Sequence, residues 1–341
     1  MNGQLLNGAS FQVEELSFLQ LNIMKTDLMR EGKIMKEQDI LEAVEKMRID
    51  WKKNDDKRDS GLPHDLPEIK RVDDIQYGND AKWNLLDIYL PKNIEGKIPV
   101  IINIHGGGWV YGTKETYQFY GLGMAKRGFA FINPNYKLGP EVKFPEELNQ
   151  VNEYIHWVAK HADEYNLDKN NVFLVGDSAG GQMAEQYTAI LTNPVYREKF
   201  GYTLPDLKFR AVALNSPATF MKDPEMMGAT LAYFDPEVMK SAKNQDLIDV
   251  EKYITGDFLP TFISTANEDF IHDCAVRLDG FLRAKGVEVI QKSWGDEKHP
   301  EPHVFLINQK DELAKEANDE EAAFFRRYIV VNCNNNLNTF V

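Results

Sequence analysis

The sequence predicts an α/β protein built on a mostly parallel sheet with helices on both faces. Short apolar runs recur along the chain and segments of helical length separate them, which is the alternation typical of βαβ units. Several of these runs, such as Val100–Ile102 and Val172–Val175, are apolar at every position. Strands that are buried on both faces have this composition, whereas half-exposed strands alternate.

The expected elements follow in chain order. Eight runs are read as strands because they are short, apolar and bounded by turn residues: Ile69–Tyr77, Trp83–Leu90, Pro99–Ile104, Phe129–Asn133, Val172–Val175, Phe209–Leu214, Thr261–Thr265 and Val287–Trp294. The spacers between and after them have helical periodicity near Thr116–Arg127, Pro145–Tyr165, Ala179–Leu191, Asp273–Lys285 and Asp311–Val330.

Two regions fall outside this alternation. Residues 11–51 carry apolar side chains three or four positions apart, and the pattern breaks near Glu31 and Gly32, so two amphipathic helices are expected. A charged, turn-rich linker is expected over Asn54–Pro67. The second region, Pro217–Gly256, separates the sixth and seventh strands and is rich in methionine, which suits an adaptable apolar lid.

The expected organisation is therefore one α/β domain with a cap. N-terminal helices over residues 1–68 contribute to the cap, and residues 69–331 form the main domain with a cap insertion at about 217–256. The asparagine-rich tail, residues 332–341, is expected to be frayed.

The composition excludes several classes of protein. Of 341 residues, 39 are Lys or Arg and 53 are Asp or Glu, so the formal charge is −14 and nucleic acid is a poor partner. No apolar run reaches the roughly 18 residues of a membrane span. The two cysteines, Cys274 and Cys333, have neither a disulfide framework nor a zinc-binding spacing. We expect a soluble, cytoplasmic protein without a membrane partner.

A short motif marks the first candidate chemical group. Residues 176–181 read Gly-Asp-Ser-Ala-Gly-Gly, follow an apolar strand and open a helix. In such a sharp strand-to-helix turn, small residues at Gly176 and Gly180 avoid clashes with neighbouring backbone. The turn lifts the Ser178 hydroxyl over the carboxyl edge of the sheet, with the positive end of the helix behind it. Ser178 is therefore the candidate nucleophile.

The second motif is a run of glycines directly after the third expected strand. Residues 105–109 read His-Gly-Gly-Gly-Trp, and adjacent glycines let backbone N–H groups face a cavity, as an oxyanion requires. The expected donors are the amides of Gly107, Gly108 and Ala179. A phosphate cradle is the competing interpretation of a glycine run, but the spacings of nucleotide-binding loops are absent.

Three side chains around the glycine run also have expected roles. His105 is expected to brace the loop by hydrogen bonding rather than to transfer protons. Trp109 and Tyr111 follow the glycines closely enough that at least one of them should line the substrate pocket. Packing in the core is the alternative for either ring.

A serine nucleophile requires a histidine to take its proton and an acid to orient that histidine. In this type of fold the acid comes next along the chain. The loop after Thr261–Thr265 offers Glu268, Asp269 and Asp273. Asp269 is preferred because it falls just past the strand end, whereas Asp273 suits a helix N-terminus. Glu268 remains the minor alternative.

The base must follow the acid, and three histidines do so: His272, His299 and His303. His272 is too close to the acid and is expected to begin a helix. His303 enters an apolar segment that can anchor its backbone, while His299 lies among charged residues and proline in an exposed loop. His303 is the preferred base and His299 the alternative.

The two motifs together resemble those of the hormone-sensitive-lipase-like branch of the α/β-hydrolase carboxylesterases, over roughly Ile69–Val331. The resemblance implies an α/β-hydrolase fold with an eight-stranded sheet and a helical cap. It also implies hydrolysis of short-chain carboxylic esters without a cofactor or metal. In it, Ser178 matches the nucleophile, Asp269 the acid and His303 the base.

The expected function is thus that of a serine carboxylesterase acting on small-molecule esters with acetyl to butyryl groups. The charge of −14 disfavours strongly anionic substrates at long range, although salt screens this within about 8 to 10 Å. Amide hydrolysis by the same triad, as in aryl formamidases or peptidase-like enzymes, is the first alternative. A non-catalytic small-ligand receptor is the second, and the complete triad argues against it. A homodimer is compatible with the sequence.

Overall fold

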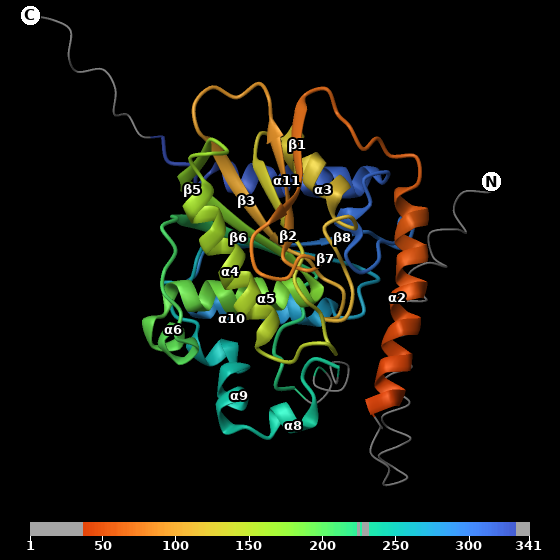
Figure 1. Cartoon of the computed structure of the whole chain (residues 1–341), viewed down its shortest axis with the longest axis vertical. Helices are drawn as coiled ribbons and strands as arrows, with labels where there is room; N and C mark the ends of the chain where they lie inside the picture. The colour runs from red at the N-terminus through yellow and green to blue at the C-terminus, as the bar shows by residue number, and fades with distance from the viewer. Residues whose placement is uncertain (1–36, 224–225, 227–231, 332–341) are drawn as a thin grey trace, which may run out of the picture.

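The computed structural model describes residues 37–223, 226 and 232–331, and one eight-stranded sheet forms its centre (Figure 1). The strand order is β1-β2-β4-β3-β5-β6-β7-β8. Strand β2 pairs antiparallel with β1 and β4, and all other neighbours pair in parallel. The strands are β1 Ile69–Gln76, β2 Leu85–Pro91, β3 Ile98–Ile104, β4 Ala130–Pro134, β5 Leu167–Asp177, β6 Phe209–Asn215, β7 Thr261–Ala266 and β8 Val289–Trp294. The predicted sheet is confirmed, and each strand overlaps its predicted range.

The central strands are buried on both faces, which explains their continuous apolar runs. Ile101 and Phe173 belong to the core cluster on one face, together with side chains of α3 and α11. The next residues, Ile102 and Leu174, belong to the cluster on the other face, with side chains of α4, α5 and α10. The helices are α3 Gln118–Lys126, α4 Glu146–His161, α5 Ser178–Thr192, α10 His272–Ala284 and α11 Glu312–Arg326.

The loops that carry the predicted site leave the same edge of the sheet. Strands β3, β5, β6, β7 and β8 pair in parallel, so their carboxyl ends lie on one edge, where α/β proteins place their ligands. The loops after β3, β5, β7 and β8 carry the glycine run, Ser178, Asp269 and His303 respectively.

Helix α2 (Glu37–Asp59) lies along one side of the molecule, apart from the helices that cover the sheet (Figure 1). Its apolar side chains pack against the loop after β3 and against the segment between β6 and β7. The cluster consists of Val44, Met47, Trp51, Val110 and Ala232. Helix α2 therefore covers the glycine run.

The linker predicted to begin at Asn54 is partly wrong, because α2 continues to Asp59. Side chains three or four positions apart pair along its last turns, Asp55 with Arg58 and Lys52 with Asp56. The high charge suggested a linker, but here opposite charges stabilise the helix instead.

The chain between β6 and β7 forms α8 (Pro236–Met239), α9 (Ala242–Leu247) and the short 3₁₀ helix η1 (Val250–Tyr253), at one end of the molecule (Figure 1). We propose that this segment and α2 form the cap expected from the sequence. Helix α6 (Pro194–Phe200) was not predicted; the Asn193 side chain caps it and a proline begins it. The first helix expected within residues 11–51 and the expected frayed tail lie outside the described residues.

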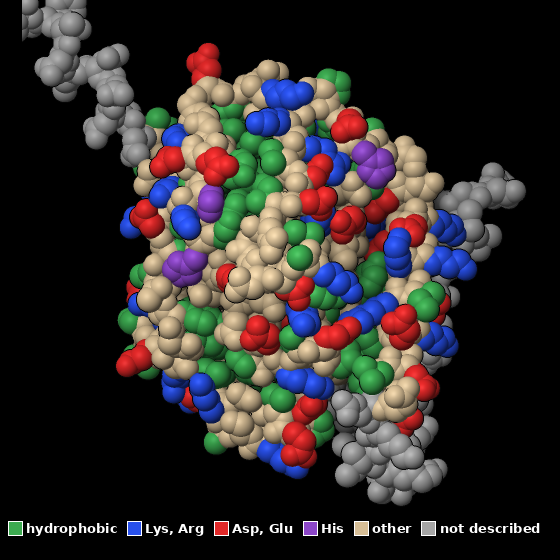
Figure 2. Space-filling view, in the orientation of Figure 1, with side chains coloured by type: hydrophobic (Ala, Val, Ile, Leu, Met, Phe, Trp, Pro, Cys, Tyr) green, Lys and Arg blue, Asp and Glu red, His purple; other side chains and the backbone are tan. Residues whose placement is uncertain are grey.

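The surface carries charges of both signs. Figure 2 shows Lys and Arg side chains interspersed with Asp and Glu over the face drawn, without a continuous basic stripe. A phosphate backbone would find no track of positive charge on this face. Within the described ranges, no helix combines the length and the apolar character needed to cross a bilayer.

Candidate active site

Ser178 lies at the junction of β5 and α5, where the chain turns sharply. Its φ of +50° is a left-handed conformation that a serine adopts only when the surroundings hold it there. The turn is tightly packed: a Cβ on Gly176 would lie 2.3 Å from the Gly180 carbonyl oxygen, and one on Gly180 would lie 2.0 Å from that of Ile104. Both glycines are therefore required by close approach of backbone, as the motif predicted.

Asp269 and His303 meet although they come from different loops. The Nδ1 atom of His303 lies 2.7 Å from Asp269 Oδ1, and the two side chains are 8% and 0% exposed. Two further groups hold the carboxylate: Thr265 Oγ1 donates to Oδ2 at 2.8 Å and the Ile271 amide donates to Oδ1 at 3.0 Å. An acid held this way orients one tautomer of the imidazole, with the proton on Nδ1.

The Asp269 carboxylate is ionised over the working range of pH. Burial by itself would raise its pKa, but the charge of His303 and the hydrogen bonds that the carboxylate accepts outweigh burial and lower the pKa to about 2. One of those donors is Ser216, which also accepts a hydrogen bond from the Val304 amide at 3.2 Å. Ser216 thus ties the acid to the loop that carries the base.

The alternative acids and bases lie elsewhere. Glu268 is exposed, and the Asp273 side chain is fully exposed at the start of α10. The His299 side chain is 74% exposed and faces Asp296 at 3.6 Å. His272 begins α10 as expected, with Nε2 3.2 Å from Ser293 Oγ. None of these side chains lines the cavity at Ser178.

A cavity of about 70 Å³ joins the predicted groups. Ser178 and His303 line it together with Gly107 and Gly108, while Ala179 follows Ser178 at the start of α5. The rest of the wall comes from α2, from the loop after the glycines and from the loops beside Asp269 and His303. These residues are Trp51, Asn54, Asp55, Arg58, Tyr111, Gly112, Thr116, Tyr117, Asp177, Phe270, Val304 and Ile307.

The glycine loop presents free amides at this cavity. Gly107 has a φ of +114°, and a Cβ there would lie 2.2 Å from the Tyr111 carbonyl oxygen. In the part of the chain that the structure describes, the amides of Gly107 and Gly108 donate no hydrogen bond. The Gly106 amide is occupied instead, by Tyr117 Oη and by Asp177 Oδ1, both at 3.0 Å. Two unoccupied donors therefore remain beside the Ser178 turn.

Asp177 is a buried acid that the sequence analysis did not single out. Besides the Gly106 amide, its carboxylate accepts a hydrogen bond from Tyr117 Oη at 2.7 Å. Burial raises its pKa to about 6, although the Tyr117 hydrogen bond and the charge of His303 act in the opposite direction. Its position next to Ser178 could have indicated it, because this turn places residue 177 against the glycine loop.

The three side chains with expected roles around the glycines lie in three different places. His105 is fully buried and stacks on Tyr136, with ring centroids 4.0 Å apart, and its Nδ1 donates to the Gly106 carbonyl at 2.8 Å. Burial lowers its pKa to about 4, so the ring is neutral. Tyr111 lines the cavity. Trp109 does not: it is buried against Phe234, and its indole N–H donates to Gln182 Oε1.

Among residues 37–223, 226 and 232–331, no three His, Cys, Asp or Glu side chains are grouped so that they could hold a metal ion. The cavity is lined instead by the Ser178 hydroxyl, the His303 imidazole and the glycine loop.

Comparison with known proteins assigns the chain to a family. The model of the BD-FAE family matches residues 86–272, more than half of the chain, from strand β2 to the start of α10. The chain belongs to the BD-FAE family. The match includes the glycine loop, the Ser178 turn and Asp269, whereas His303 lies beyond its end.

Curated relatives of this BD-FAE member include named esterases. The carboxylesterase NlhH of Mycobacterium tuberculosis is 27% identical over 238 residues, which cover 67% of this chain and 74% of the relative. A protein of Acanthamoeba polyphaga mimivirus, named provisionally as an alpha/beta hydrolase, is 31% identical over 169 residues, 49% of this chain. That match spans about half (48%) of the viral protein's length.

Solved esterase structures share the fold of this BD-FAE member. Esterase B from Lactobacillus rhamnosis, solved with a tributyrin phosphonate inhibitor, has a TM-score of 0.79 at 23% identity, covering 86% of this chain and 96% of that one. The bacterial heroin esterase has a TM-score of 0.65 at 20% identity, covering 83% and 91%. The predicted resemblance to α/β-hydrolase carboxylesterases is confirmed, which places the protein among the carboxylic ester hydrolases.

Proposed function

We propose that the protein is a serine carboxylesterase that hydrolyses short-chain esters of small molecules. The observation that carries this proposal is the 2.7 Å hydrogen bond between His303 and Asp269 beside a cavity that Ser178 also lines. A hydroxyl, an oriented imidazole and unoccupied backbone amides are the groups that acyl transfer from an ester requires.

In the proposed reaction Ser178 Oγ attacks the ester carbonyl while Nε2 of His303 takes the hydroxyl proton. The amides of Gly107, Gly108 and Ala179 receive the negative charge of the tetrahedral intermediate. His303 then gives the proton to the leaving alcohol. Water attacks the acyl-enzyme in the same way and releases the acid, and Asp269 stabilises the imidazolium in both halves.

The small cavity supports a preference for acyl groups from acetyl to butyryl. A volume of about 70 Å³ holds roughly five to seven water-sized groups, if about 10 to 15 Å³ is allowed for each. Ring side chains of Trp51, Tyr111 and Phe270 limit the cavity. A long acyl chain would have to displace them.

The test removes the proposed nucleophile and the proposed base in turn, and a nearby exposed histidine is the control for the base. Ser178→Ala and His303→Ala should each lower kcat on p-nitrophenyl acetate by about 10³-fold or more, because triad members act as a unit. His299→Ala, at the exposed histidine a few positions away, should leave kcat within twofold of the wild type. A phosphonate probe should form an adduct on Ser178 that mass spectrometry locates.

Two outcomes would contradict the proposal. Undiminished turnover in Ser178→Ala would exclude the nucleophile, and equal losses in the two histidine variants would exclude the assignment of the base. A chain-length series from acetate to palmitate tests the acyl preference, and a maximum at palmitate would overturn it. Faster cleavage of a matched anilide than of the ester would favour the amide hydrolase.

A further inference from the structure

One stripe of helix α2 contacts the glycine loop and the residues just after it. Arg48, Trp51, Asp55 and Arg58 are three or four positions apart, so they lie on one face of the helix. Arg48 Nε donates to the Val110 carbonyl at 2.7 Å. The stripe thus combines an apolar ring with three charged groups, and each of its members has a contact in the segment from Gly108 to Thr116.

At the centre of the stripe, Trp51 and Asp55 contact the glycine loop and Tyr111 directly. A Cβ on Gly108 would lie 3.5 Å from Trp51 Cη2, and the Trp51 and Tyr111 rings meet edge to face with centroids 5.6 Å apart. The Tyr111 hydroxyl donates to Asp55 Oδ2 at 2.7 Å. Tyr111 is therefore held by α2 at both its ring and its hydroxyl.

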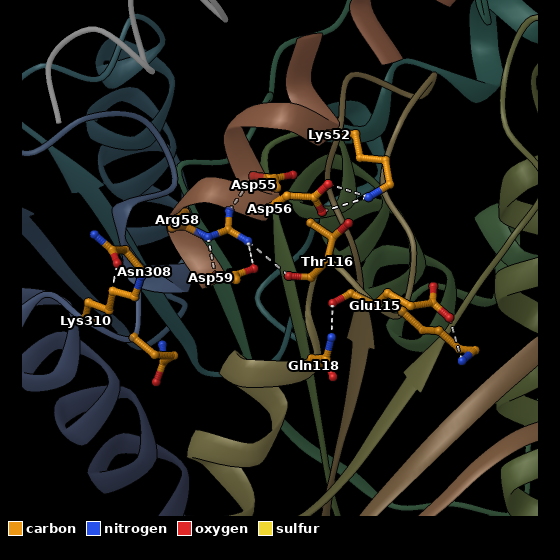
Figure 3. Close-up of polar contacts among 12 residues, drawn as sticks. Lys52, Asp55, Asp56, Arg58, Asp59, Glu115, Thr116, Gln118, Asn308 and Lys310 are labelled. Carbon is orange, nitrogen blue, oxygen red and sulfur yellow. Dashed lines mark hydrogen bonds and ion pairs between the residues drawn. The ribbon is translucent and has the colours of Figure 1, made fainter. Parts of the chain in front are cut away.

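Arg58 fixes the Asp55 carboxylate from the other side. Its Nη1 donates to Asp55 Oδ1 at 2.6 Å, and its Nε and Nη2 donate to the two oxygens of Asp59 at 2.8 and 2.6 Å (Figure 3). Nη2 also donates to the Thr116 carbonyl at 3.2 Å. With two carboxylates and one carbonyl already bound, the guanidinium is a brace rather than a receptor for a substrate anion.

Backbone hydrogen bonds connect Tyr111 to the loop that carries the free amides of Gly107 and Gly108. The amides of Val110 and Tyr111 both donate to the Gly107 carbonyl, at 3.0 and 2.9 Å, so residues 107–111 form a closed turn. On the other side, the Gly106 amide is held by Asp177 and Tyr117. Gly107 and Gly108 therefore lie between an anchor on the sheet and an anchor on α2.

We propose that Asp55 and Tyr111 are positioning residues: their hydrogen bond, braced by Arg58, holds Gly107 and Gly108 where their amides receive the oxyanion. The inference rests on the proposed esterase function. Helix α2 then affects the rate of the chemical step, in addition to limiting the size of the group that the cavity holds. Backbone donors stabilise an oxyanion only at the right position, and a displacement of about 1 Å can cost about 10²-fold in rate.

The test uses Tyr111→Phe, which keeps the ring against Trp51 and removes only the hydroxyl. We expect kcat on p-nitrophenyl acetate to fall about 10-fold while KM changes less than twofold, since the hydrogen bond acts on the transition state. An alkyl boronic acid that adds to Ser178 should lose affinity by the same factor. Asp55→Asn combined with Tyr111→Phe should cost less than the product of the two single losses.

Tyr202→Phe is the matched control, because Tyr202 Oη donates to Asn149 Oδ1 at 2.6 Å away from the cavity. It should keep kcat and boronic acid affinity within twofold of the wild type, whatever its melting temperature. A Tyr111→Phe variant with wild-type kcat and boronic acid affinity would overturn the inference, as would a change confined to KM or to the melting temperature. A wild type that neither cleaves esters nor forms a phosphonate adduct would instead refute the esterase proposal itself.

Discussion

At the scale of single residues, Asp177 shows how the site uses a buried charge. The carboxylate accepts hydrogen bonds from Tyr117 and from the Gly106 amide, yet burial still raises its pKa to about 6 from an ordinary value of 3.8. The folded protein therefore holds this proton more tightly than the unfolded chain does. Between about pH 4 and pH 6, ionisation of Asp177 opposes folding, and the contribution of this group to stability falls as the pH rises through this window.

We predict that Asp177→Asn removes this cost. Its free energy of unfolding relative to the wild type should rise by on the order of 3 kcal/mol from pH 4 to pH 7, as a shift of about two pKa units implies. Urea unfolding at several pH values measures the difference. Asp273→Asn, at a fully exposed side chain, is the control. A relative stability of Asp177→Asn that falls with pH would contradict the sign of this argument.

The candidate site residues that the sequence predicts are those whose place depends on local pattern and chain order. Ser178 and the glycines were identified because a strand precedes each motif, and Asp269 because it lies just past a strand end. Asp55 and Arg58 were missed, because the helical pattern was followed through apolar residues only. Their partners lie in the glycine loop, far along the chain, and no local pattern in one sequence indicates such a pairing.

At the scale of elements, the α5 turn depends on a glycine that cannot carry a side chain. A Cβ on Gly180 would lie 2.0 Å from the Ile104 carbonyl and 2.4 Å from that of His105, and backbone cannot move away cheaply. We predict that Gly180→Ala costs more than about 3 kcal/mol of stability, through overpacking and backbone strain, and disrupts the Ser178 turn. Thermal unfolding and labelling of Ser178 by a phosphonate measure both effects.

Gly280 provides the matched helix position for that experiment. It lies in α10, is exposed, and a Cβ there would meet no atom within 4 Å. Gly280→Ala should raise stability by about 0.5 to 1 kcal/mol, because alanine loses less backbone entropy on entering a helix. If the two substitutions changed stability equally, close contact with neighbouring backbone would not be the reason that position 180 requires glycine.

The sequence predicts the strands better than the helix ends and the short helices, and the reason is physical. All eight strands were found. The central strands are apolar at nearly every position because both of their faces are buried, whereas the edge strands β1 and β8 are only partly buried and were found from their length and the turn residues around them. Helix α2 was predicted too short. Its last turns are as rich in charged residues as a linker, but ion pairs such as Lys52–Asp56 stabilise them as a helix. The short helices α6, α8 and α9 were missed because four to seven residues are too few to show a period.

At the scale of the whole molecule, the net charge of −14 acts on every substrate that approaches. Figure 2 shows charges of both signs mixed over the face drawn, so neither sign gathers in a patch there. At the cavity wall, the two carboxylates of Asp55 and Asp177 outnumber the single guanidinium of Arg58, which also pairs with Asp59 outside the wall. The global and the local charge therefore have the same sign.

We predict a salt dependence that changes sign with the charge of the ester. From 10 mM to 150 mM salt the screening length falls from about 30 to about 8 Å, which weakens the long-range field. The kcat/KM for 4-acetoxybenzoate, an anion, should rise about two- to fivefold, while that for 4-acetoxybenzyltrimethylammonium, a cation, should fall by a similar factor. The neutral p-nitrophenyl acetate is the control and should change little. A common salt dependence for all three esters would mean that the net charge does not govern access to the cavity.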